Sequence, residues 1–453
     1  MRAWAVVLAL SCVASISAPA AAQEAEALRK EIEALQKQLQ SVTERLQRLE
    51  AQPRPPQPAP AAPMPAPALG AAPPASLGIS PADLARPRQP FSLYQQRGAG
   101  QLLFDMGVAG DFVGNLTQSN VEKAGGGTFA GQENRFFPRE VELGLFGQVD
   151  PYAYAEVRIE TGEASRGGDL NVTLAEGAVT MLTLPFGTQA KFGQMRNRFG
   201  YTNLIHEHDL PWIDRPNVLR NFLGDEGLKE KGLEVTIVPD LPFYLEGLVG
   251  VFNGDNETAF GRGTLRVPMF TGRLRTFLEL GDASALQLGM SVASGETGEK
   301  RRDTVLGWEA RYKYRPEGWL HPLVTLTSEA IYALRRVNVD VDTDGDGLTD
   351  LIKKRERDRF GWYAGLEVQP LRRWAAGVRY DWSQFPDRPG SERAIEPYVS
   401  FWTSEFLRFR LAYKNTTRDH RDGFDLNGGT ARKVDEVLFQ GTFILGAHPA
   451  HPF

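Results

Sequence analysis

The feature that most constrains the fold is an alternation of apolar and charged residues, with a period of two, in short segments between residues 101 and 446. In one segment Trp308, Ala310, Tyr312 and Tyr314 alternate with Glu309, Arg311, Lys313 and Arg315. Successive side chains of a β-strand point to opposite faces, so the pattern predicts strands with one apolar and one charged face. Such strands fit a soluble sandwich with an apolar core, or an outer-membrane barrel whose apolar face meets lipid.

The number and spacing of these segments favour the barrel. Sixteen strands of about ten residues, the length that a tilted membrane strand needs, are expected at 101–113, 138–149, 152–161, 171–183, 188–198, 232–238, 243–252, 259–268, 285–294, 304–315, 322–336, 360–369, 374–383, 393–402, 406–416 and 433–446. Short connections alternate with long ones, which is typical of outer-membrane barrels and places both barrel ends in the periplasm. Residues 273–280 also alternate, and we assign them to a periplasmic connection because another strand would make the count odd. The predicted fold is all-β, a 16-stranded antiparallel transmembrane β-barrel over residues 96–453.

Three segments are expected before the barrel. Residues 1–22 are a predicted signal peptide, with Arg2 ahead of an apolar stretch and Ala20 to Ala22 at the cleavage site. A lipoprotein signal ending at Cys12 is the alternative, although Ala9-Leu10-Ser11 matches such a signal poorly. Residues 52–95 form a predicted Pro/Ala-rich linker, because 13 of the 30 prolines fall between residues 52 and 90. At about 3.1 Å per residue, this extended spacer can reach about 100 Å.

Residues 23–51 are a predicted coiled coil. Their apolar residues are spaced four and three apart and are Leu28, Ile32, Leu35, Leu39, Val42, Leu46 and Leu49. A single helix of this length is marginal in water, so the pattern predicts self-association. The heptad positions leave the number of copies open. We expect this helix to lie in the periplasm.

Composition excludes several classes of protein. The formal net charge is −5, with acids and bases spread along the chain, whereas a nucleic-acid binder would carry a basic stripe. After residue 22 there is no apolar run near the roughly 18 residues that a transmembrane helix needs. No nucleophile–base pair, phosphate-binding glycine loop or dinucleotide fingerprint is found, so we predict that the protein is not an enzyme.

Short segments inside the predicted barrel carry a family resemblance. They are Phe137–Leu145, Ala190–Gln194 and Gly250–Asn256. Together with the order of signal, coiled coil, proline linker and barrel, they resemble the phosphate-selective porin family (porins O and P) over most of residues 100–453. The resemblance implies sixteen strands, a homotrimer and a lumen that conducts small anions. In that family, lumenal arginines and constriction lysines select phosphate, but this ladder does not map residue by residue here, and the inferred lumenal faces also carry glutamates such as Glu156, Glu160 and Glu176.

The long connection 199–231 follows the fifth expected strand, where porins fold a loop inward to narrow the pore. The candidate anion-binding residues at this constriction are Arg196, Arg198, Arg215 and Arg220, and those along the wall are Arg311, Lys313, Arg379, Arg408 and Arg410. A permeating anion would exchange its water for charge-assisted contacts with arginine and lysine side chains. The alternative is that these arginines pair with neighbouring carboxylates and only hold the loop. His206, His208 and Asp209 could bind a transition metal or form a solvated patch.

A second motif predicts calcium binding. Asp342, Asp344, Asp346 and Asp350 occupy positions 1, 3, 5 and 9 of a calcium-loop pattern, with Gly347 at position 6 for the turn. Lys353 replaces the usual glutamate at position 12, so the expected affinity is weak. The alternative is an acidic loop without a specific ion. No other cofactor is expected.

Two functions remain open from the sequence. The first is an outer-membrane porin, a passive channel for small hydrophilic solutes with a preference for phosphate-like anions, which assembles as a trimer in lipid. The second is a structural or adhesive envelope barrel tethered through its coiled coil, with peptidoglycan as a partner. A soluble all-β secreted binder is a third reading of the alternation.

Overall fold

The computed structural model describes residues 104–124, 126–163, 168, 170–316, 318, 321–341, 351–387, 389–419 and 432–446. The predicted signal peptide, coiled coil and linker lie outside these residues. The predicted calcium ligands, Asp342 to Asp350, lie outside them as well. These predictions are therefore neither confirmed nor contradicted.

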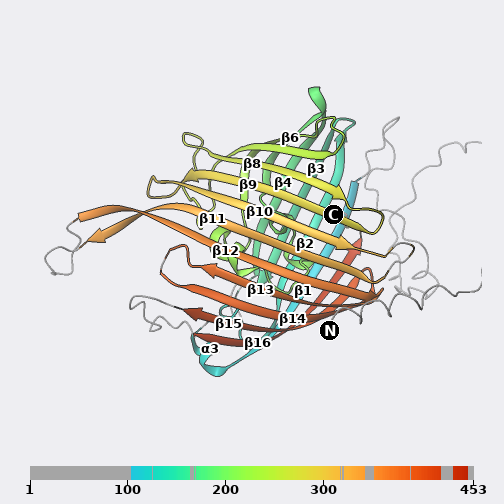
Figure 1. The fold of residues 1–453 in the computed structure, drawn as a ribbon, viewed down its shortest axis with the longest axis vertical. Helices are drawn as coiled ribbons and strands as arrows, with labels where there is room; N and C mark the ends of the chain where they lie inside the picture. Colours follow the sequence, from blue (N-terminus) through green and yellow to red (C-terminus); the bar gives the residue numbers. More distant parts are fainter. Residues whose placement is uncertain are drawn as a thin grey trace, which may run out of the picture. The chain divides into compact units, whose positions relative to one another are not determined.

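Sixteen antiparallel strands form one closed barrel (Figure 1), which confirms the predicted fold class. Each strand pairs with its neighbours in the chain, and β1 pairs with β16 to close the sheet. The strands are β1 (Phe104–Thr117), β2 (Arg135–Asp150), β3 (Ala153–Glu163), β4 (Leu170–Leu184), β5 (Thr188–Arg196), β6 (Lys229–Ile237), β7 (Tyr244–Phe252), β8 (Met269–Glu279), β9 (Ser284–Glu296), β10 (Arg302–Tyr314), β11 (Leu323–Val341), β12 (Leu351–Leu371), β13 (Trp374–Gln384), β14 (Ser391–Ser404), β15 (Leu407–Asp419) and β16 (Lys433–Gly446).

The polarity of the two barrel faces is inverted relative to a soluble protein. In β15 the side chains of Leu411 and Tyr413 are 50% and 44% exposed on the outside, whereas Arg410 and Lys414 are 2% and 1% exposed on the inside. The same alternation places aliphatic and aromatic side chains outward along most strands. An apolar outer face around a charged interior is the arrangement that lipid outside and water inside would stabilise.

The connections differ at the two rims of the barrel. Residues 151–152, 185–187, 372–373 and 405–406 make short turns at the rim where β1 begins and β16 ends. The longer connections 118–134, 197–228 and 253–268 lie at the other rim. This distribution agrees with the alternation of short and long connections expected from the sequence.

The eighth strand differs from the prediction. The structure places β8 at Met269–Glu279, and the whole of the expected strand 259–268 belongs to a connection. Gly261 and Gly263 have φ values of +86° and +62°, which interrupt an extended chain. Within β8, Arg273 points inward at 3% exposure and Leu274 outward at 58%. The alternation in 273–280 was therefore the true strand signal, and replacing one segment by the other leaves the count even.

One connection, here called the L3 segment (residues 197–228), packs inside the barrel. It contains the short helices η2 (Thr202–Leu204), η3 (Glu207–Asp209) and α4 (Asn217–Leu223). Trp212, Val218 and Phe222 of this segment form one buried cluster with barrel residues of β11 and β12, such as Ile331 and Tyr363. The interior is thus partly filled by the chain itself. Another short helix, α3 (Ser119–Ala124), lies in the first connection.

Glycines in the wall allow this close approach. A Cβ atom added at Gly361 would lie 2.6 Å from the Val218 side chain, and one at Gly365 would lie 2.5 Å from the Trp212 ring. Both glycines are on β12. The sequence therefore leaves room on the inner wall where the L3 segment docks. None of the helices in the described residues is long and apolar enough to cross a membrane.

Candidate functional site

Two groups of charged residues hold the L3 segment across the lumen. The first is on the side of β2 to β4 and includes His206 and His208. The second is on the side of β13 and β15 and centres on Asp214. The predicted inward-folded loop at 199–231 thus corresponds to a real feature, and its charged residues are largely fixed by contacts with the wall.

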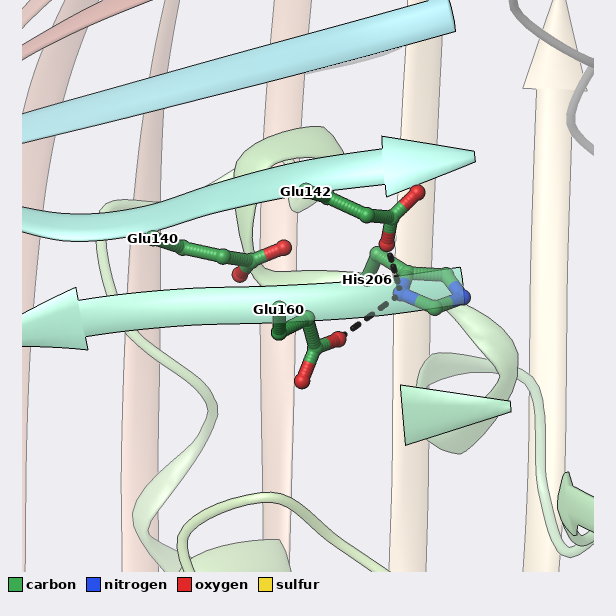
Figure 2. Close-up of side chains that lie close together, drawn as sticks. All are labelled: Glu140, Glu142, Glu160 and His206. Carbon is green, nitrogen blue, oxygen red and sulfur yellow. Dashed lines mark ion pairs between the residues drawn. The ribbon is translucent and has the colours of Figure 1, made fainter. Parts of the chain in front are cut away.

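His206 lies beside Glu142 and Glu160 of the wall (Figure 2), and Glu176 contacts its other ring nitrogen. Its Nδ1 atom is 2.8 Å from Glu142 Oε2 and 3.4 Å from Glu160 Oε1. Its Nε2 atom is 3.1 Å from Glu176 Oε1. Glu142 and Glu160 are directly opposite each other in the register of β2 and β3. The imidazole therefore separates like charges that would otherwise repel across the strand pair.

The protonation of both histidines follows from this environment. Burial and the charge of Arg196 lower the pKa of His206, but its close contacts with the carboxylates of Glu142, Glu160 and Glu176 outweigh them and raise it to about 10. His208 Nδ1 lies 2.9 Å from Glu140 Oε1, and its Nε2 lies 2.9 Å from Asp209 Oδ2. Burial lowers the pKa of His208, whereas these two carboxylates raise it well above its ordinary value. Both rings are therefore positively charged at neutral pH.

Asp214 makes the contacts on the opposite side. Its carboxylate lies 2.7 Å from Arg379 Nη2 and 2.5 Å from Lys414 Nζ. Burial raises the pKa of Asp214, but the charges of Arg379, Lys414 and Arg220 lower it below its ordinary value. Arg379 also lies 2.8 Å from Glu396 of β14. This buried ionic group joins the L3 segment to three consecutive strands of the wall.

The four arginines predicted at the constriction all contact carboxylates. The shortest side-chain distances are 3.6 Å for Arg196–Glu160, 3.0 Å for Arg198–Glu234, 2.6 Å for Arg215–Glu207 and 2.9 Å for Arg220–Asp225. Arg215 also donates to the backbone oxygens of Thr202 and Ile205. These contacts match the alternative reading in which the arginines hold the loop.

The predicted wall residues have more varied partners. Arg408 donates to the backbone oxygen of His208, and Arg410 donates to that of Leu210 at 3.1 Å and to Gln440 at 2.8 Å. The Arg311 guanidinium lies 4.3 Å from the centre of the Tyr201 ring. Lys313 follows two residues later on the same face of β10. Arg379 belongs to the ionic group of Asp214, so several wall cations also bind the L3 segment.

A cavity of about 400 Å³ lies between the L3 segment, residues 128–132 and strands β2 to β5. Its lining includes four arginines (Arg139, Arg196, Arg215 and Arg220) and seven carboxylates (Glu140, Glu160, Glu163, Glu207, Asp214, Asp225 and Glu226). The lining therefore has three more acids than arginines. A solute in this cavity would meet both signs of charge.

The residues best placed to hold a metal ion are Glu140, Glu142, Glu160 and His206. One donor atom from each lies within 4.8 Å of the others. The sequence pattern groups His206 with His208 and Asp209 as possible metal ligands, indicates Glu160 only as a lumenal glutamate, and does not connect Glu140 or Glu142 with the site. The period-two spacing of Glu140 and Glu142 was an available signal, because it places both on the same face of β2.

The chain is similar to known proteins in sequence and in structure. No protein-family model matches the chain. An uncharacterised protein of Aquifex aeolicus (strain VF5) is 29% identical, over 69% of each chain. The outer membrane channel DcaP of Acinetobacter baumannii has a TM-score of 0.50 and 13% identity, covering 78% of this chain and 99% of DcaP. An anion-selective porin from Comamonas acidovorans has a TM-score of 0.48 and 11% identity, covering 76% of this chain and 98% of that one. The likeness to DcaP shows the fold.

Proposed function

We propose that the protein is an outer-membrane porin through which small hydrophilic solutes diffuse passively, with no catalytic activity. The observation that carries this proposal is the closed sixteen-stranded barrel, apolar outside and ionised inside, with a charged segment across its lumen. A row of ionised side chains on an inner barrel face is stable only where water or counter-charges reach it. The fold shared with the channel DcaP supports the same proposal.

The proposed solutes are small anions of the phosphate type. Acids outnumber arginines in the 400 Å³ cavity, so selection for anions would fall to the wall cations beyond it. Arg408 contacts a backbone oxygen, and Arg410 contacts a backbone and an amide oxygen. A phosphate oxygen could replace those acceptors. Arg311 and Lys313 on β10 add two positive charges to the lumen.

Planar bilayers test both parts of this proposal. The full-length protein should give ohmic single-channel steps, and a salt gradient should give a reversal potential of the sign for anions. Phosphate should block chloride current, and the double variant Arg408→Ala, Arg410→Ala should weaken that block by about tenfold, as expected for lost charge-assisted contacts. Lys433→Ala is a suitable control, because Lys433 is 67% exposed at the start of β16. If the barrel conducts but prefers cations, the proposed channel function would stand and the proposed preference for anions would be refuted.

The second candidate function is a structural envelope barrel with little transport. The apolar packing of the L3 segment favours it, because Trp212, Val218 and Phe222 fill part of the lumen. We propose in either case a homotrimer in the outer membrane, with the coiled coil of residues 23–51 on the periplasmic side near peptidoglycan. The heptad spacing of that segment supports self-association, and the family resemblance implies three copies. A closed barrel in the bilayer experiment would favour this second function.

We also propose that Asp342, Asp344, Asp346 and Asp350 bind Ca²⁺ weakly. The support is the spacing of these four residues in the sequence. Calcium should protect the segment 342–350 from proteolysis in the millimolar range. The variant Asp344→Asn should lose this protection, and equal protection in both proteins would contradict the site.

A further inference from the structure

Four potential metal ligands converge on one point at the inner wall. Glu140 and Glu142 come from the lumenal face of β2, Glu160 from β3 and His206 from the L3 segment (Figure 2). Their exposed fractions are 6%, 3%, 8% and 4%. Three separate parts of the chain thus bring an imidazole and three carboxylates together in a buried place.

The atoms facing this point are not satisfied by hydrogen bonds. His206 Nδ1, Glu142 Oε2 and Glu160 Oε1 are all buried and have no hydrogen-bond partner of acceptable geometry among the described residues. Nδ1 nevertheless lies 2.8 Å from Glu142 Oε2 and 3.4 Å from Glu160 Oε1. Buried polar atoms at such distances normally align a hydrogen between them. In this structure the positive charge of the imidazole holds these atoms together, and a divalent cation could take the place of its Nδ1 proton among the same carboxylates.

The surroundings orient the donors toward this point. The other ring nitrogen of His206, Nε2, lies 3.1 Å from Glu176 Oε1. A carboxylate behind the distal nitrogen is the usual partner of a metal-binding histidine, because it fixes the ring and its tautomer. Arg158 contacts Glu142 Oε1 at 2.6 Å, which leaves Oε2 directed at His206. Glu176 and Arg158 thus orient the ligands, but they are not ligands themselves.

Two of the four residues border a cavity that could admit an ion. Glu140 and Glu160 also line the 400 Å³ cavity between the L3 segment and the wall. A mixed set of one imidazole and three carboxylates suits first-row transition metals such as Zn²⁺, Fe²⁺ or Mn²⁺. Ca²⁺ and Mg²⁺ prefer sites made only of oxygen atoms.

We propose that Glu140, Glu142, Glu160 and His206 bind one divalent transition-metal ion, which displaces the Nδ1 proton of His206 into solvent and fastens the L3 segment to β2 and β3. The ion would link residues that are distant in the chain and would stabilise the docked segment. This proposal does not depend on the transport function, because it concerns binding by the folded barrel.

Titration of the full-length protein in detergent with Co²⁺ and Zn²⁺ tests the proposal. We expect one equivalent of Co²⁺ to bind with the intense visible absorption of a four- or five-coordinate ion, and Zn²⁺ to displace it. His206→Gln should abolish this absorption, and Glu160→Gln should weaken it. Glu176→Gln, which changes the residue behind the ring, should weaken binding by about tenfold.

The matched control is His321→Gln. His321 lies in the connection between β10 and β11, far from β2 and β3 in the strand order, so its removal should change nothing. Circular dichroism would confirm that each variant keeps its sheet. Absence of binding to the wild-type protein, the weak spectrum of hydrated Co²⁺, or unchanged binding in a folded His206→Gln or Glu160→Gln variant would each overturn the proposal.

Discussion

The L3 segment contacts opposite sides of the lumen in different ways. Against β11 and β12 it buries Trp212, Val218 and other apolar side chains on a wall that has glycines to receive them. Against β2 to β4 it places His206 and His208 among buried carboxylates. Apolar packing is insensitive to pH, whereas a buried ionic cluster depends on the charge of each member. The L3 segment therefore has an apolar attachment that does not depend on pH, and ionic attachments at His206 and at Asp214 that do.

The largest effect is expected on the apolar side. Trp212→Ala removes a ring that is 2% exposed and that packs edge-on against Tyr363, with ring centres 5.3 Å apart. The lost contacts and the cavity left behind should weaken docking of the L3 segment by about 4 kcal/mol. Single-channel conductance should rise and become noisy. Unchanged conductance and unchanged thermal stability would show that this side does not hold the segment.

A smaller but still large effect is expected for Asp214→Asn. The change leaves Arg379 and Lys414 buried without the charge that Asp214 supplies. Breaking such a buried ion pair should cost about 3 kcal/mol. Thermal unfolding in detergent would measure the loss, and a variant as stable as the wild-type protein would contradict the role given to this contact.

The pH dependence should distinguish the ionic attachment at His206 from the one at Asp214. Since the pKa of His206 is raised to about 10 in the folded protein, its stabilisation is complete below its unfolded pKa of about 6.5 and is lost as pH rises through about 10. The pKa of Asp214 is lowered, so its contribution is present above an unfolded pKa of about 3.9 and is lost as pH falls below that value.

Conductance of the metal-free protein, recorded between pH 3 and pH 11, provides the measurement. We expect a stable conductance level up to about pH 9 and increased fluctuations near pH 10. The His206→Gln variant should fluctuate at every pH, so that the alkaline transition disappears. An identical alkaline transition in the variant would assign the titration to another group.

The smallest effect is expected for Asp225→Asn, a matched control for Asp214→Asn. Both aspartates contact Arg220, at 2.9 Å for Asp225 and 3.6 Å for Asp214. The side chain of Asp225 is 82% exposed, and exposed ion pairs contribute less than about 1 kcal/mol. Thermal stability and conductance should therefore stay near the wild-type values. A loss of stability as large as that of Asp214→Asn would mean that burial does not decide how much each contact contributes.

The sequence predicts the barrel well because each strand carries its own signal. The alternation in β10 and β15 depends only on neighbours in the chain, so it can be recognised without the fold. The error at β8 arose because Thr264 to Val267 alternate within a connection, whereas the glycine conformations that exclude a strand depend on the local backbone. The charged residues of 199–231 were also recognised from the sequence.

The partners of those residues were not predictable from spacing. Asp214 meets Arg379 and Lys414 only because the sheet closes and the L3 segment crosses the lumen, which brings together residues about 165 and 200 positions apart. The pairing of Glu142 with Glu160 was more accessible, since the short turn at 151–152 fixes the register of β2 and β3. Closure of the sheet, which is a long-range event, decides the rest of the site.

A cross-link between Val218→Cys and Gly361→Cys tests most directly whether the L3 segment narrows a conducting lumen. The two positions are adjacent in the structure, and the only native cysteine, Cys12, lies in the predicted signal peptide. We expect the disulfide to form in the membrane-embedded protein and the oxidised channel to conduct like the wild-type protein. Failure to form the bond, or a wild-type barrel that passes no current, would contradict the account.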